Sequence, residues 1–117
     1  MGVNRNEIIL QGVKLTHKQF SDAGGYEKFE KFMYDTYKKG TRRELSIIAD
    51  GMDGKYAFVG FPLFVGGDAR YGDDGIYEPI LIEPPKGCEE KATLDFVRDN
   101  FGISQDKCET YVFSYYH

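Results

Sequence analysis

The order in which β-prone and helix-periodic segments follow one another is the feature that most constrains the fold of this chain. Runs rich in β-branched and aromatic residues, separated by glycine- and proline-containing turns, predict strands. These runs are 7–15, 44–50, 55–61, 76–82 and 108–117. Segments 26–39 and 89–101 instead repeat apolar residues every three to four positions, which predicts helices. The order β-α-β-β-β-α-β predicts an α+β fold, with two helices packed on a mixed or antiparallel sheet of about five strands.

The helix predicted over residues 26–39 has the clearest local signals. Lys38 and Lys39 complement the negative end of a helix dipole, and Gly40 suits the left-handed position that ends a helix. The residues before this helix, 16–25, are expected to form a loop. The apolar stripe of the helix follows steps of three and four, with Phe32 on its flank: Tyr26, Phe29, Met33 and Tyr37.

Glycine and proline mark the expected strand irregularities. The turn at 51–54 joins runs 44–50 and 55–61 into a hairpin. Pro62 has no amide to donate, so the second strand is expected to end there, or to continue as an edge or past a kink over 63–65. Gly12 predicts a bulge or a close approach of two backbones.

Length and composition favour one domain covering residues 1–117. Of the 117 residues, 41% are hydrophobic and 29% are charged, which allows a buried core. The net charge of −4 argues against a general nucleic-acid binder, which normally carries a basic face. No apolar stretch approaches the length of a membrane span or a signal segment. A soluble cytoplasmic protein with no membrane contact is therefore expected.

The two cysteines, Cys88 and Cys108, are expected to be free thiols. A helix between them would be about 18 Å long, with one cysteine near each end, whereas a disulfide needs Cα atoms within about 7 Å. No histidine lies near either cysteine in the sequence, so no zinc site is predicted. No cofactor motif is present either.

The loop 66–75 is the most suggestive candidate site. Its glycines would let backbone amides approach a ligand, its aspartates could hold a hard cation and its arginine an anion. The spacing matches neither a calcium loop nor a phosphate loop, so we interpret it first as a connection and second as a recognition loop. Its candidate binding residues are Asp68, Arg70, Tyr71, Asp73 and Asp74.

A basic cluster, residues 38–43, is the second candidate. Arg42 and Arg43 could contact a phosphate or an acidic protein surface, but a helix end followed by a solvated strand explains the cluster as simply.

The aromatic run at 108–117 is the third candidate. Alternation places Tyr111, Phe113 and Tyr115 on one face, and Val112, Ser114 and Tyr116 on the other. Because neither face is strongly polar, both are expected to be at least partly covered, as in a central strand or a contact between subunits.

No catalytic motif is recognisable, so an enzyme is the less favoured class. The sequence favours a small binding module, such as an inhibitor or an accessory protein of a mobile element, that contacts a protein partner or itself. Tyr111, Tyr115, Tyr116 and the loop 66–75 would make the contact. One alternative is a small-molecule or nucleotide binder that uses the glycine- and aspartate-rich loop 66–75 and Arg70. Another is a metal-assisted hydrolase that uses Asp68, Asp73 and Asp74.

Overall fold

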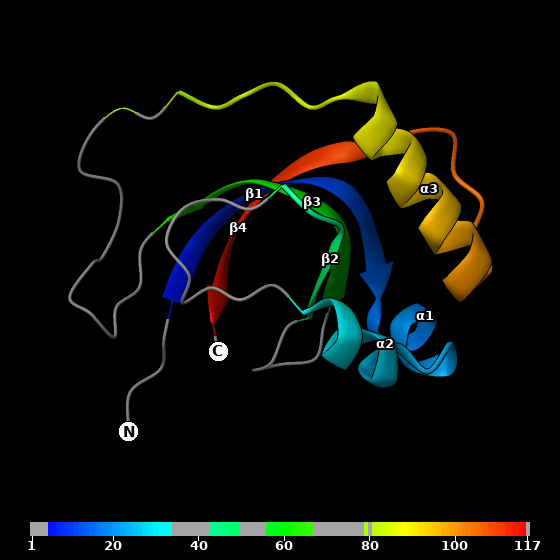
Figure 1. Ribbon diagram of the computed structural model, residues 1–117. Helices are drawn as coiled ribbons and strands as arrows, with labels where there is room; N and C mark the ends of the chain where they lie inside the picture. Colours follow the sequence, from blue (N-terminus) through cyan, green and yellow to red (C-terminus); the bar gives the residue numbers. More distant parts are fainter. Residues whose placement is uncertain (1–4, 34–42, 50–55, 67–78, 80, 117) are drawn as a thin grey trace.

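The computed structural model describes residues 5–33, 43–49, 56–66, 79 and 81–116 (Figure 1). Its strands form one antiparallel sheet in the order β2-β3-β1-β4. The α+β class is therefore confirmed, and the sheet is antiparallel. The strands are β1 (Arg5–Thr16), β2 (Ser46–Ala49), β3 (Tyr56–Gly66) and β4 (Glu109–Tyr116), and the helices are α1 (His17–Asp22), α2 (Gly25–Phe32) and α3 (Gly87–Phe101).

Helix α1 occupies a segment that was expected to be a loop. The Thr16 hydroxyl accepts a hydrogen bond from the Gln19 amide at 3.1 Å, and the Gln19 side chain accepts one from the Thr16 amide at 2.9 Å. This reciprocal pair satisfies two amides at the start of a helix. Gly24 then adopts a left-handed conformation, φ 67°, which separates α1 from α2.

Helix α2 ends earlier than its sequence predicts. Met33 is extended, with ψ 130°, and forms a parallel bridge to Ile47 beside β2, so the helix stops at Phe32 and not at Lys39. The expected apolar stripe is wrong at two of its positions, because Tyr26 and Met33 are 53% and 55% exposed. Phe29 and Phe32 are the α2 residues that pack against the core. Residues 34–42 lie outside the described residues.

Strand β3 continues through Pro62 as far as Gly66, as the alternative of a kink predicts. Leu10 pairs with Pro62 and Ile9 with Phe64, so the register shifts at Leu63. The pairing between β2 and β3 ends at Gly60. Pro62 lies beyond this point, so its missing amide costs β2 no hydrogen bond. Pro79 and residues 81–82 are not in a strand, and the rest of the fifth predicted strand, 76–78 and 80, lies outside the described residues.

Gly12 marks a close approach of two strands, and the register shift lies elsewhere. It pairs with Gly60 across the β1–β3 ladder. A Cβ on Gly12 would lie 2.1 Å from the Val59 carbonyl oxygen, and one on Gly60 would lie 2.1 Å from the Gln11 carbonyl oxygen. A side chain at either position would therefore push the backbones of β1 and β3 apart.

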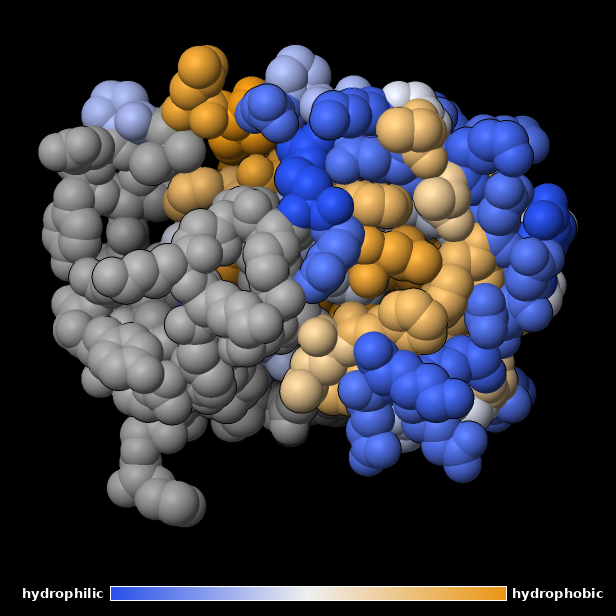
Figure 2. All heavy atoms as spheres, viewed as in Figure 1, coloured by the Kyte–Doolittle hydropathy of each residue, from blue (hydrophilic) through white to orange (hydrophobic). Residues whose placement is uncertain are grey.

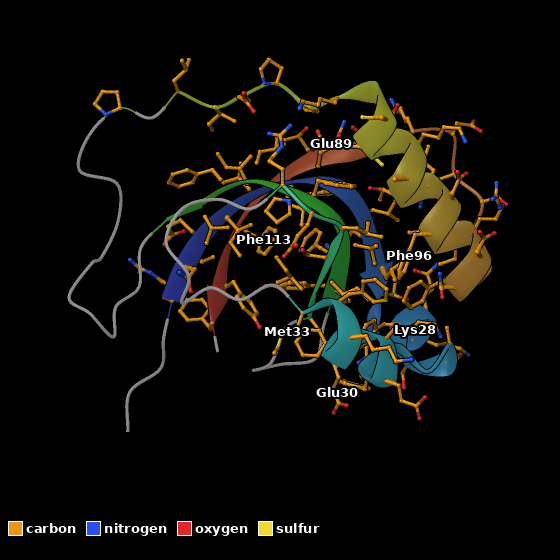
Figure 3. The ribbon with its side chains drawn as sticks, viewed as in Figure 1. Lys28, Glu30, Met33, Glu89, Phe96 and Phe113 are labelled. Atoms are coloured by element: carbon orange, nitrogen blue, oxygen red, sulfur yellow. The ribbon has the colours of Figure 1, made fainter. Side chains whose placement is uncertain are left out.

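The sheet curves (Figure 1). It carries an apolar cluster on each face. One cluster, which includes Leu15, Val59 and Val97, lies under the helices, and the Phe32 and Phe96 rings meet there at 4.9 Å. Figure 2 shows apolar side chains reaching the surface between α2 and α3, inside a ring of hydrophilic ones. The other cluster lies on the inner side of the curve, where Figure 3 places Phe113. The sheet is thus the centre of the fold, with β1 in its interior.

Candidate interaction surface

Strand β4 lies at the edge of the sheet. All eight of its residues pair with β1, from Glu109 opposite Gly12 to Tyr116 opposite Arg5, without a register shift. No other strand within the described ranges pairs with the second edge of β4. Among the described strands β4 is therefore an edge strand, and of the two alternatives left open by the sequence, a central strand and a contact between subunits, it is not the first.

Beyond its first residue, β4 lacks the features that usually prevent edge strands from pairing with other chains. Lysine, proline, a bulge or a very short length commonly serve this purpose. Residues 110–116 carry no charge and no proline, and the strand is regular over its whole length. Its one charged residue, Glu109, is at the start and pairs with Lys107 at 3.4 Å. Strand β2, at the opposite edge, has only four residues.

The inner face of β4 packs against β3. The rings of Phe58 and Phe113 stack with centroids 4.2 Å apart, and the Tyr111 ring lies 5.0 Å from that of Phe58. Tyr115 is only 7% exposed and belongs to the same cluster. These contacts hold β4 against the sheet, so Tyr111 and Tyr115 have mainly inward contacts, unlike the exposed Tyr116.

The outer face of β4 is open. Val112 is 75% exposed and Tyr116 is 43% exposed, so the expectation that both faces are covered is wrong for this face. Between them, the Ser114 hydroxyl donates a hydrogen bond to a Glu7 carboxylate oxygen at 2.7 Å, and Arg5 pairs with the same carboxylate at 3.0 Å. The outer face therefore presents two apolar side chains beside a polar group already satisfied within the chain.

Arg43, a predicted binding residue, lies in a largely buried ion pair. Its guanidinium donates two hydrogen bonds to the Glu89 carboxylate, at 2.7 and 3.0 Å, and two more to the carbonyl oxygens of Glu83 and Pro84. The Arg43 and Glu89 side chains are 18% and 7% exposed. The Lys86 amide also donates to Glu89. This network joins the start of α3 to the segment before β2, and it occupies four of the five N–H donors of Arg43.

The electrostatics of this pair follow from its geometry. Burial by itself raises the pKa of the Glu89 carboxyl, but the hydrogen bonds from Arg43 and Lys86 outweigh it, so the pKa lies below its usual value. The hydrogen bond to Glu89 likewise raises the pKa of Arg43. Both side chains therefore stay charged at neutral pH.

The remaining predicted site residues lie outside the described residues. They are Asp68, Arg70, Tyr71, Asp73 and Asp74 of the loop 66–75, and Arg42 of the basic cluster. Ligand binding by this loop, and metal-assisted chemistry by its aspartates, stay predictions. Among the residues that are described, no cluster of acidic, histidine or cysteine side chains could hold a metal ion.

Both cysteines are free thiols, as expected, although one premise of that prediction is wrong. Cys108 does not lie beyond the far end of the helix, because its amide donates to the Glu90 carboxylate at 2.9 Å, near the start of α3. Burial, followed by the negative charge of Glu90, raises the pKa of the Cys108 thiol to about 11. Cys88 is exposed.

The exposed edge of β4 is the feature that sequence reasoning missed. The signal was the absence of charge and proline over 110–116, but strand order was needed to interpret it. No helix in the described part of the chain is long and apolar enough to cross a membrane. The chain matches no family model, and no similar curated protein or solved structure was found. Function must therefore be argued from this surface.

Proposed function

We propose that this chain is a protein-interaction module that binds an extended segment at the outer edge of β4. In this mode of recognition, an extended peptide adds a strand to an exposed sheet edge, main-chain hydrogen bonds supply affinity and side-chain contacts supply specificity. The observation that carries the proposal is an eight-residue edge strand with neither a charge nor a proline over residues 110–116.

The packing of β4 supports this proposal in two ways. The stack of Phe113 on Phe58 fixes the strand before a partner arrives, so little conformational entropy is lost on binding. Val112 and Tyr116 then offer apolar contacts on the outer face. An inhibitor that works by pairing with an extended strand of its target would use the same edge.

A peptide selection tests this function without knowledge of the natural partner. A phage-displayed library of random dodecapeptides is panned against the full chain. The binding site of each selected peptide is then mapped by the changes it causes in the backbone amide chemical shifts of the protein. We expect β-prone peptides whose shifts concentrate on residues 109–116. Val112→Lys adds a charge to the exposed face of the edge strand and should weaken the binding of these peptides by about tenfold or more.

Leu81→Lys is the matched control. Leu81 is 98% exposed and lies outside the strands, so this variant adds the same charge away from β4. It should leave peptide binding unchanged. Selected peptides that bind through other residues, or that bind the Val112→Lys variant equally well, would show that the edge is not the binding surface.

A further inference from the structure

We infer that the strand added to β4 is β4 of a second copy, running antiparallel to the first about a twofold axis. This inference rests on the proposed function and names its partner. The resulting assembly would have one continuous sheet of eight described strands, with the two β4 strands at its centre.

The charge distribution of β4 favours self-pairing. When two identical strands pair antiparallel about a twofold axis, residues near the middle of one strand lie opposite residues near the middle of the other. A charge near the middle would therefore lie close to the same charge of the second copy. Residues 110–116 contain no charge, and Glu109 lies at one end, where antiparallel pairing carries it far from the Glu109 of the partner subunit. Like charges directly opposite each other destabilise a strand pair, and this pairing avoids them.

The side chains of β4 also complement one another in the register centred on Val112. The two Val112 side chains, exposed in the single chain, would face each other on the outer face. On that face Thr110 would lie opposite Ser114, a hydroxyl pair that stabilises neighbouring strands. On the inner face Tyr111 would lie opposite Phe113, extending the ring contacts that both already make with Phe58.

The size of the edge predicts a weak dimer. Eight residues span about 27 Å at about 3.4 Å per residue, and one strand edge buries less than the roughly 1,600 Å² of a standard interface. Association should therefore be concentration-dependent, with a dissociation constant of about 10–100 µM. Each copy carries a net charge of −4, so added salt should strengthen the dimer by screening repulsion.

Sedimentation velocity on the full chain, from about 1 to about 500 µM, tests the inference. We expect the weight-average mass to rise from one copy toward two. Val112→Lys should raise the dissociation constant by about tenfold or more, because two lysines would face each other across the axis. Leu81→Lys should dimerise like the original chain. Val112 is mostly exposed, so circular dichroism should show both variants equally folded.

A cysteine cross-link tests the register and does not depend on the lysine variant. In a Cys88→Ser background, Val112→Cys would place two thiols opposite each other across the axis, with Cα atoms about 4.5–5.5 Å apart, within the range that a disulfide spans, and mild oxidation should give a covalent dimer. Leu81→Cys in the same background should give far less.

The outcomes separate this inference from the proposed function. If the chain stays monomeric at the highest concentration while selected peptides still bind at β4, self-pairing is wrong and the edge serves another protein. A dimer that resists Val112→Lys, and in which Val112→Cys does not cross-link, also overturns the inference because it uses another surface. A monomer that binds no peptide at β4 contradicts both proposals.

Discussion

The ion pair between Arg43 and Glu89 gives a stability prediction whose magnitude depends on pH. Arg43→Met removes the counter-ion of a carboxylate that is only 7% exposed and leaves the Lys86 amide as its remaining donor. Breaking a buried pair on one side costs about 3–5 kcal/mol in general. Because Arg43 retains 18% exposure and solvent can relax around the site, we expect a loss of about 2–4 kcal/mol at neutral pH.

Glu89→Gln should cost less than Arg43→Met. A glutamine keeps an oxygen that can accept from the Lys86 amide, and Arg43 keeps its bonds to the carbonyl oxygens of Glu83 and Pro84. We expect a loss of about 1.5–3 kcal/mol, the scale of a hydrogen bond to a charged group. The double variant should lose less than the sum of the two single losses, since the side chains contact each other.

The pH dependence follows from the lowered pKa of Glu89. A carboxyl whose pKa is lower in the folded state contributes stability that is fully present above the unfolded value, about 4.3, and is lost as the pH falls through the folded value. In the Arg43→Met variant burial acts without the guanidinium, so the pKa of Glu89 rises relative to the original chain. Acidification then neutralises the unpaired carboxylate, and the difference in stability between the two proteins should shrink toward about pH 4.

Urea unfolding followed by circular dichroism, at about pH 7 and about pH 4, measures these quantities. The Lys91–Asp95 pair on α3 is the control, because both side chains are well exposed, and Lys91→Met should cost less than about 0.5 kcal/mol. A loss below about 0.5 kcal/mol for Arg43→Met at neutral pH, or a loss that stays constant on acidification, would refute a buried and mutually stabilising pair.

Two further predictions concern the centre of the sheet and the thiols. Gly12→Ala should destabilise the fold by about 3 kcal/mol or more in urea titration, because its Cβ would overlap the Val59 carbonyl. Gly87→Ala is the control, because a Cβ there meets nothing within 4 Å, and it should change stability by less than about 0.5 kcal/mol. Equal effects of the two variants would contradict the close approach of β1 and β3. Cys88 should react with a disulfide reagent at about pH 8, whereas Cys108 should react only when the protein unfolds. A pKa of about 11 leaves about one Cys108 thiol in a thousand deprotonated at that pH. Equal reaction rates for the two cysteines would contradict the burial of Cys108.

Local signals in the sequence were sufficient where short-range contacts decide the structure. Helix α3 begins and ends within two residues of its expected bounds, and Gly102, directly after it, adopts the left-handed conformation in which glycine commonly ends a helix. The start of α1 also had a local signal, the Thr16 and Gln19 pair, but β1 runs into it without a turn. That missing boundary hid a capping pattern that the sequence carries.

Tertiary pairing overrode local signals elsewhere. Lys38, Lys39 and Gly40 resemble a helix end, yet the helix stops at Phe32, since Met33 bridges Ile47 in β2. No periodicity within 26–39 contains that information, because it depends on a strand more than a dozen residues away.

The role of β4 depends on contacts between residues that are far apart in the sequence. A strand that is strongly polar on neither face is equally typical of a sheet centre and of an edge that pairs with another chain. Its sequence cannot separate these cases, because the choice is made by contacts such as the hydrogen bond between Ser114 and Glu7, 107 positions apart. Once β1 takes the interior position, β4 keeps an interior composition at an edge. An edge of this composition pairs readily with whichever strand approaches it, so a specific partner in that position is what would keep it from aggregating.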